Sequence, residues 1–452
     1  MISKATYFSF DSYNISRDAK SIDFNYSIGF DLAKPVHFTS NILLPLPISE
    51  KKQSQPLGVI LEPLHLMLGI SYWKLYCPKE IRIPYVLDYQ QAQFWNTVYT
   101  KGMGEFYYRN EIDFRGLVSF PYTKTDQKKS VSFQPENRSL VGVAGGKDSI
   151  VSVELLKKTG KSITALIFET SHEYPLIRSV HKRMDIPGIY IKHMLDSKLA
   201  SLNETGIPYN GHIPISAIYA FLGFLTSVIY DYSYVIVSNE KSANFGSVIY
   251  HGMEINHQWS KSDEFERLFT NYTKAYITPE ITYFSLLRPL TELKISSIFA
   301  QYTKYFPYFS SCNRNFLSKD SRALYGLTRS TGWCGRCPKC AFTFAMLGPW
   351  IPRQKLLTIF GHDLFSEKNL VSLYRKLLGV EDIKPFDCVG TFEEVAVALY
   401  MMYQKGEYAE TPVMKMFVKD ILPGFRNAKK LKKYVLEIAD KSSLPDNFKN
   451  VL

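Results

Sequence analysis

The chain has 452 residues, of which 46% are hydrophobic and 21% are charged, a composition typical of globular proteins that excludes disorder over most of its length. This length is enough for two or three domains. The formal net charge of +12 predicts an anionic partner, a condition that nucleotides, nucleic acids and anionic membranes all meet. The first residues lack the basic and then apolar pattern of a signal peptide, so a cytoplasmic protein is expected.

Residues 1–135 are rich in Phe, Tyr, Ile and Pro. Alternating runs such as residues 21–29 predict strands and turns. We expect this part to be a separate β-rich domain that shapes the substrate site. The polar stretches at residues 124–130 and 134–138 are the predicted linker.

A strand, a tight turn and a helix are predicted over residues 139–158. Residues 139–144 (SLVGVA) form an apolar run, and apolar side chains recur at helical spacing after residue 148. Two adjacent glycines in the turn allow a close approach to a ligand, and the free N–H groups of the helix start favour phosphate. The turn reads Ala144-Gly145-Gly146-Lys147-Asp148-Ser149.

The charged residues of this turn indicate nucleotide chemistry. Lys147 adds a positive charge, whereas Asp148 is suited to hold Mg²⁺, and Asp148 or Ser149 is predicted to begin the helix. A Walker A loop is excluded, because its spacing between the glycines and its Lys-Ser or Lys-Thr pair are absent. An ordinary tight turn with a capping Asp stays open as the simpler interpretation.

The turn resembles the Ser-Gly-Gly-X-Asp-Ser loop of the PP-loop ATP pyrophosphatases, with Ala144 in place of the first Ser. That replacement would remove one hydroxyl contact to phosphate. The resemblance implies ATP and Mg²⁺ as cofactors and release of pyrophosphate when AMP is transferred to an oxygen of the substrate. The residues that it assigns to ATP are Gly145, Gly146, Lys147, Asp148 and Ser149.

From residue 139 onward, apolar runs alternate with helical segments, which predicts an α/β fold with a parallel sheet and helices on both faces. Ligands bind such sheets at the carboxyl ends of the strands, where Asn239 and Glu240 follow a predicted strand; Glu240 is a candidate for a second Mg²⁺ or a substrate group. The predicted segments are 163–169, 172–184, 188–194, 213–230 and 234–238. A PP-loop domain with a metal site is expected over residues 136–350 and a mainly helical region over 351–452.

The segment at residues 213–230 is uncharged for 18 residues. It contains Pro214, two serines and a threonine, and another strand-like segment follows almost at once. We therefore expect a buried helix of the α/β core and no membrane span.

Four of the six cysteines form a metal-binding pattern. Cys334, Cys337 and Cys340 lie in a C-x2-C-x2-C sequence, and Cys312 precedes Cys334 by 22 positions. Four thiolates complete the tetrahedron that structural Zn²⁺ prefers and leave no open position for catalysis. An iron–sulfur cluster and free thiols stay open as alternatives. The predicted zinc would hold a loop near the ATP site.

Further stretches of the chain resemble one enzyme family across nearly the whole sequence. They are 210–216 (NGHIPIS), 237–244 (VSNEKSAN), 256–262 (NHQWSKS), 288–293 (RPLTEL) and 384–391 (KPFDCVGT), together with 72–74 and 104–106. These residues are similar to those of the UDP-N-acetyl-α-D-muramoyl-L-alanyl-L-glutamate epimerase family. The glycine turn followed by the cysteine set is also similar to the 7-cyano-7-deazaguanine synthases.

The first resemblance implies an ATP-dependent enzyme of peptidoglycan precursor biosynthesis. Such an enzyme converts the terminal L-Glu of a UDP-muramoyl dipeptide to D-Glu and releases AMP and pyrophosphate. Adenylation removes the carboxylate charge and makes the carbonyl an electron sink, so that a base can take the α-proton. The expected partner is this small molecule, without nucleic acid or membrane, and the oligomeric state is left open.

Proton transfer at the α-carbon requires one or two bases, and Cys388, His212 and His257 are the candidates, with Asp148 serving adenylation. Cys388 is the first choice because it lies outside the metal set, although a buried structural thiol is an equally open interpretation. For Cys77 the sequence favours core packing. Arg288 and Arg314 are further candidates, as clamps for a carboxylate or diphosphate.

Three alternatives remain at this point. An adenylating enzyme that acts on a deazaguanine-like carboxylate would need ammonia and no UDP-sugar pocket. A PP-loop protein that modifies tRNA would suit the positive charge, but the basic residues do not follow an RNA-binding motif. A non-catalytic ATP-binding module is disfavoured by the combination of Lys147 and Asp148.

Overall fold

The computed structural model describes residues 4–124, 130–316 and 332–452. Residues 125–129 of the predicted linker lie outside these ranges, so that part of the prediction stays untested. The strands are β1 (Ala5–Ile15), β2 (Ser21–Phe30), β3 (Val36–Leu43), β4 (Glu80–Arg82), β5 (Glu136–Gly142), β6 (Ile163–Glu169), β7 (Gly188–Met194), β8 (Tyr232–Val237), β9 (Val248–Tyr250), β10 (Met253–Ile255) and β11 (Thr282–Ser285).

Helices α1 to α10 precede β11, and the rest follow it. They are α1 (Glu50–Gln53), α2 (Gly58–Leu68), α3 (Ile70–Trp73), α4 (Tyr89–Lys101), α5 (Gly104–Arg109), α6 (Lys147–Lys158), α7 (Pro175–Met184), α8 (Lys198–Glu204), α9 (Ile215–Tyr230), α10 (Asp263–Tyr276), α11 (Glu292–Phe299), α13 (Pro338–Leu347), α14 (Arg353–Phe360), α15 (Val371–Leu377), α16 (Phe392–Lys405), α17 (Pro412–Met416) and α18 (Ala428–Leu436).

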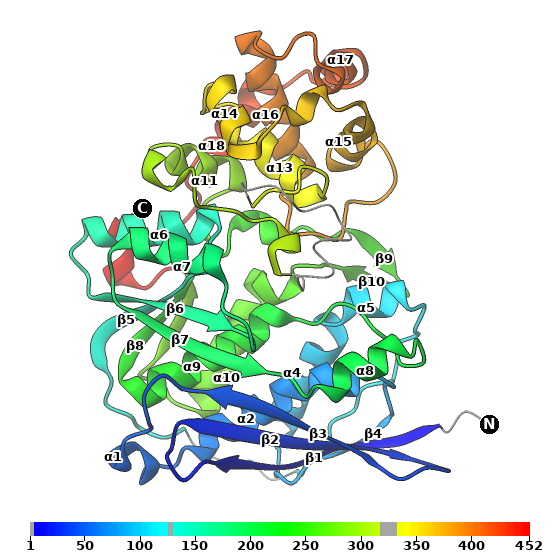
Figure 1. Cartoon of the computed structure of the whole chain (residues 1–452), viewed down its shortest axis with the longest axis vertical. Helices are drawn as coiled ribbons and strands as arrows, with labels where there is room; N and C mark the ends of the chain where they lie inside the picture. The colour runs from blue at the N-terminus through cyan, green and yellow to red at the C-terminus, as the bar shows by residue number, and fades with distance from the viewer. Residues whose placement is uncertain (1–3, 125–129, 317–331) are drawn as a thin grey trace.

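One large sheet runs through the N-terminal and central parts of the chain (Figure 1). Within the described ranges it has nine strands in the order β11-β8-β5-β6-β7-β3-β2-β1-β4. The strands from β11 to β7 are mutually parallel, and β1, β2 and β3 pair antiparallel. The two halves meet where β3 pairs antiparallel with β7. The boundary predicted near residue 135 therefore falls within a continuous sheet, and the division into three domains stays a prediction.

Helices cover both faces of the parallel strands, as predicted. Adjacent residues on one strand belong to different cores: Val141 packs with α6 and α7, whereas Leu140 packs with α2, α4 and α9. The same alternation places Ile236 in the first core and Val235 in the second. Strands buried on both faces read as continuous apolar runs, which is why the sequence revealed them.

The bounds of several predicted elements agree with the structure. The strands expected at 163–169 and 188–194 are β6 and β7 residue for residue, and the helix expected at 213–230 is α9. In the N-terminal part the expectation of strands and turns holds for β1 to β4, but this part also contains the helices α1 to α5, which were not predicted. Helix α2 is buried on almost every side and contains Pro63, so its sequence lacks an amphipathic period.

The C-terminal part of the chain, for which a mainly helical region is predicted, consists of helices and turns. Residues 351–452, all of them described, contain helices and 3₁₀ turns but no strand. These helices lie above the parallel strands in Figure 1. Helices α13, α16 and α18 pack against α11, and α11 in turn packs against α6. The chain end returns to the sheet, where Phe448 packs against Tyr234 and Phe284. Among the helices of the described ranges, none is long and apolar enough to cross a membrane.

Candidate active site

The glycine turn, residues 144–149, joins β5 to α6 at the carboxyl edge of the parallel strands. Gly145 has a φ of +80°, and a Cβ there would lie 2.6 Å from Cδ2 of Leu176. Gly146 is the extended N-cap of α6, so the helix begins at Lys147 and not at Asp148 or Ser149 as predicted. The Ser149 hydroxyl donates to the Gly146 carbonyl at 3.0 Å, which secures the first turn of the helix.

Lys147 points into the protein and not into solvent. Its ammonium group forms ion pairs with Asp148 and with Glu292, the first residue of α11, and only 2% of its side chain is exposed. Burial opposes the charged form, but the two carboxylates raise the pKa of Lys147 above its ordinary value. A second lysine, Lys339, places Nζ 3.8 Å from Oε1 of Glu292.

Two buried glutamates lie near this lysine pair. Burial raises the pKa of Glu240 and of Glu292, and repulsion from Asp148 adds to that effect. Burial also acts to raise the pKa of Asp148, but Lys147 and Lys339 bring it below its usual value. The lysines therefore offset the charge of these three carboxylates, which would otherwise repel one another in a buried position.

Cys388 lies next to Lys339 and to a third lysine, Lys261. Lys261 Nζ is 3.3 Å from Cys388 Sγ, and Lys339 donates to the Cys388 carbonyl. Burial raises the pKa of the Cys388 thiol, but Lys261, His257 and Lys339 lower it to about 6. The side chain is only partly buried, so a thiolate here is both favoured and accessible.

A histidine pair and a glutamate adjoin the thiol. His257 Nδ1 hydrogen-bonds Glu105, and His212 Nδ1 lies 3.5 Å from the same carboxylate oxygen. The two imidazole rings are 4.6 Å apart. Burial would lower the pKa of His257, but Cys388 and Glu105 raise it to about 10, whereas burial and the His257 cation lower the pKa of His212 to about 3.

The glycine turn and the thiol belong to one electrostatic site. Lys261 and Lys339 both lower the pKa values of Asp148 and Cys388, so the same two cations face both groups. The structure thus brings together most of the predicted residues, which come from distant parts of the chain. They are Lys147, Asp148, His212, Glu240, His257 and Cys388.

Other candidates have local structural partners. Asn239 donates to the Ser285 hydroxyl at 3.1 Å and is buried. Arg288 is buried and donates to Glu266 and to the backbone carbonyls of Glu240 and Lys261, which indicates a structural role. The buried Cys77 thiol donates to the Lys74 carbonyl, in agreement with core packing. Arg314 lies in the 3₁₀ turn Asn313–Phe316.

Four charged residues of the site were missed by sequence reasoning. Glu292 follows an N-cap threonine and reads as an ordinary first-turn acid, and Lys339 lies inside the cysteine motif. Glu105 and Lys261 lie within stretches that resembled the epimerase family, without a chemical reason to select them. A signal was available for Glu292 alone, because a lysine buried in a glycine turn requires a second countercharge.

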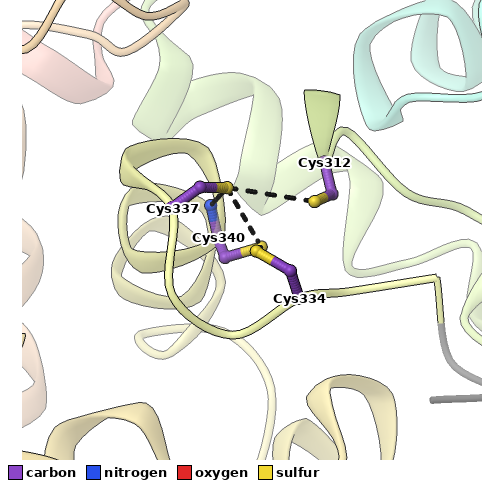
Figure 2. Close-up of side chains that lie close together, drawn as sticks. All are labelled: Cys312, Cys334, Cys337 and Cys340. Carbon is purple, nitrogen blue, oxygen red and sulfur yellow. Dashed lines mark hydrogen bonds between the residues drawn. The ribbon is translucent and has the colours of Figure 1, made fainter. Parts of the chain in front are cut away.

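The four predicted metal ligands converge (Figure 2). Cys334, Cys337 and Cys340 lie at the start of α13, and Cys312 approaches from a separate segment. Their sulfur atoms all lie within 4.8 Å of one another, with separations of 3.9 Å for Cys312–Cys337 and 3.6 Å for Cys334–Cys340. A tetrahedral Zn²⁺ with Zn–S bonds of about 2.3 Å requires sulfur separations of about 3.8 Å. The donor set therefore fits one tetrahedral ion, whereas the irons of a cluster would divide the four thiolates among them.

The cysteine set lies beside the glycine turn. The Ser310 backbone N–H donates to the Gly145 carbonyl at 3.1 Å, and the Ser310 hydroxyl donates to the Gly332 carbonyl at 2.8 Å. Ser310 precedes Cys312 by two positions, and Gly332 precedes Cys334 by two. An ion held by the four thiolates would fix both segments against the turn.

The fold and the site define an α/β enzyme in which a glycine turn at the sheet edge adjoins a thiol with a lowered pKa. The chain belongs to the MurL family. The model of the MurL N-terminal domain matches residues 1–286, and the model of the MurL C-terminal domain matches residues 308–432.

Three similar proteins carry the name UDP-N-acetyl-alpha-D-muramoyl-L-alanyl-L-glutamate epimerase. The protein from Xanthomonas oryzae pv. oryzae is 37% identical over 80% of this chain and 78% of its own length. Those from a Micromonospora species and from Salinispora tropica are each 35% identical over 92% of this chain, and over 91% and 89% of their own lengths.

Proposed function

We propose that this chain is an ATP-dependent epimerase that converts the terminal L-Glu of UDP-MurNAc-L-Ala-L-Glu to D-Glu, with a role in peptidoglycan precursor synthesis. The names of its relatives support the substrate and the stereochemical change. The proposed route has two halves, adenylation of the glutamate carboxylate and proton transfer at the neighbouring carbon. ATP and the nucleotide-linked substrate both favour a cytoplasmic site of action.

Adenylation is assigned to the glycine turn. The free N–H groups of the first turn of α6 are suited to the phosphates of ATP, whereas the buried Lys147 would hold Asp148 and Glu292 in place behind them. Asp148 and Glu240, with Glu292 beside them, would hold Mg²⁺, which neutralises phosphate oxygens when bound. A substrate carboxylate oxygen attacks the α-phosphorus, the bond to the β-phosphate oxygen breaks, and pyrophosphate leaves.

Proton transfer is assigned to Cys388. Its thiolate takes the α-proton of the adenylated glutamate, and the electron pair moves to the carbonyl oxygen. Lys261 and Lys339 lie near enough to stabilise the charge that develops there. The Cys388 thiol, or a second acid on the other side, then gives a proton to the opposite face and inverts the carbon. Attack of water on the acyl carbon releases AMP.

The observation that carries this proposal is that Lys339 contacts both the Cys388 carbonyl and Glu292, the carboxylate that pairs with Lys147 of the glycine turn. The activating turn and the thiol are therefore joined by one set of charged contacts. No feature of the described ranges favours the deazaguanine or tRNA alternatives, which lack the family match. Structural Zn²⁺ at Cys312, Cys334, Cys337 and Cys340 is part of the proposal, because the sulfur separations fit it.

The test follows AMP, glutamate configuration and α-deuterium together. The purified protein is incubated in ²H₂O with ATP, Mg²⁺ and UDP-MurNAc-L-Ala-L-Glu. We expect AMP formation, D-Glu and deuterium at the glutamate α-carbon. AMP release without inversion would contradict the epimerase and leave adenylation standing, whereas inversion without ATP would contradict the adenylation half.

A further inference from the structure

Glu105 is linked to Cys388 through His257. The Glu105 carboxylate binds Nδ1 of His257, and His257 and Cys388 favour each other's charged form, since His257 lowers the pKa of the thiol and Cys388 raises that of the imidazole. With Nδ1 engaged, Nε2 is the ring nitrogen left for other partners. A thiol, an imidazole and a carboxylate in this order form the arrangement that activates a cysteine in other proteins.

The carboxylate at the far end of this chain of contacts is held firmly. Glu105 is 6% exposed, and its Oε1 accepts a hydrogen bond from Nε of Arg109 at 2.6 Å, one turn along α5. Its Oε2 serves both His257 and His212. Because both oxygens have cationic or imidazole partners, the carboxylate remains ionised and its direction is fixed.

We propose that Glu105 is a positioning residue that keeps His257 as an imidazolium and so holds Cys388 as a thiolate before the substrate enters. This inference rests on the proposed function, in which Cys388 is the base. Glu105 acts through His257 and does not touch the reacting atoms. His212 stays neutral beside the His257 cation, with the two rings 4.6 Å apart.

The same three side chains are a geometric candidate for a metal ion, since Glu105, His212 and His257 each bring a ligand atom within 4.8 Å of the others. Charge disfavours this reading. The pKa of His257 is raised to about 10, so an ion would have to displace a proton that the ring holds at neutral pH. The ion would also lie close to the positive charge of Arg109, which pairs with Glu105. A protonated His257 supplies the positive charge there without that cost.

Several charged groups affect the pKa of Cys388. Besides His257, the cations Lys261, Lys339 and Lys384 act on Cys388. Removal of the Glu105 charge lowers the proton affinity of His257 and thus weakens one of these cations. The pKa of Cys388 should then rise, while Lys261 and Lys339 retain part of the effect.

The test is alkylation of Cys388 by iodoacetamide as a function of pH, followed by mass spectrometry of the peptide that carries it. The wild-type midpoint is expected near pH 6. In Glu105→Gln it should move upward by about one unit, so that alkylation at pH 6.5 slows roughly threefold. Glu105→Asp, which keeps the charge, should move the midpoint back towards the wild-type value.

Glu381→Gln is the matched control, because Glu381 pairs with Arg375 in the C-terminal helices. It should leave the midpoint unchanged. An equal midpoint in wild type and Glu105→Gln, with native circular dichroism, would overturn the proposal. The proposal would also be overturned if the wild-type protein bound a divalent ion outside the cysteine site and the Glu105→Gln variant did not bind it. No dipeptide enters this experiment, so a wild-type protein without epimerase activity would contradict the proposed function separately.

Discussion

Lys261 Nζ lies 3.3 Å from Cys388 Sγ, although the two residues are 127 positions apart. The pairing favours both charged forms, because Lys261 lowers the pKa of Cys388 and the thiolate raises the pKa of Lys261. A thiol held in this way can serve as a base at neutral pH. Its function in the proposed reaction depends on the cation beside it.

Replacement of Lys261 by Met should therefore impair proton exchange more than adenylation. Loss of the cation raises the pKa of Cys388, and we expect α-deuterium uptake at pH 7 to fall about tenfold or more. Measurement of AMP and deuterium in one sample separates the two effects. Lys241→Met is the control, because Lys241 pairs with the exposed Tyr434; equal deuterium uptake in the two variants would refute the role of Lys261.

The pH dependence should report both members of the thiol–imidazole pair. Cys388 must lose its proton to act as a base, so α-exchange should rise with pH through about 6. It should then stay level through about pH 9, because His257 keeps its proton up to about pH 10 and the thiolate is fully formed. A rate profile that is flat from pH 5 to 8 would be incompatible with Cys388 as the base.

Asp148→Asn should abolish AMP formation. The variant removes a carboxylate proposed to hold Mg²⁺ and leaves Lys147 paired with Glu292 alone. Alkylation of Cys388 at pH 7 should persist, because Lys261 and His257 remain in place. Retention of wild-type AMP release by this variant would remove Asp148 from the adenylation site.

Gly145 and Gly160 form a natural pair for testing the glycine turn. Both have positive φ, but a Cβ at Gly145 would meet Leu176 at 2.6 Å, whereas one at Gly160 meets nothing within 4 Å. Alanine at either position should cost about 1 kcal/mol of unfolding free energy through strain, and Gly145→Ala should cost more. Only Gly145→Ala should also weaken ATP binding, as measured by a thermal shift with Mg²⁺ and ATP. Equal stability losses would argue against close packing at the turn.

Removal of the metal should affect the glycine turn through Ser310. Cys312→Ser is expected to lose zinc and to weaken ATP binding, because Ser310 donates to the Gly145 carbonyl. Elemental analysis and ATP titration measure the two effects. Cys77→Ala, outside the cluster, should retain the metal; full zinc content in Cys312→Ser would contradict the four-thiolate site.

The parallel sheet could be predicted from local sequence patterns, but the N-terminal helices could not. Strands β6 and β7 were predictable because turn residues bound short apolar runs. Helix α2 and the segment after it bury nearly every side, so neither the helical nor the strand period is visible. Pairing of β3 with β7 joins residues about 150 positions apart, which no local pattern encodes.

The site divides in the same way. The glycine turn and the cysteine motif are contiguous in sequence, so their chemistry could be predicted from spacing. Glu105 and His257 lie 152 positions apart and meet only through folding. Their contact also depends on charge balance among buried groups, which becomes visible once burial is known.

The most direct test of the central claim is α-hydrogen exchange by Cys388→Ser in ²H₂O. We predict that this variant forms AMP from ATP and the dipeptide but incorporates no deuterium, whereas the wild-type protein does both and exchanges only when ATP is present. Wild-type exchange without ATP, or normal exchange by Cys388→Ser, would contradict the account in which adenylation makes the α-proton available to this thiolate.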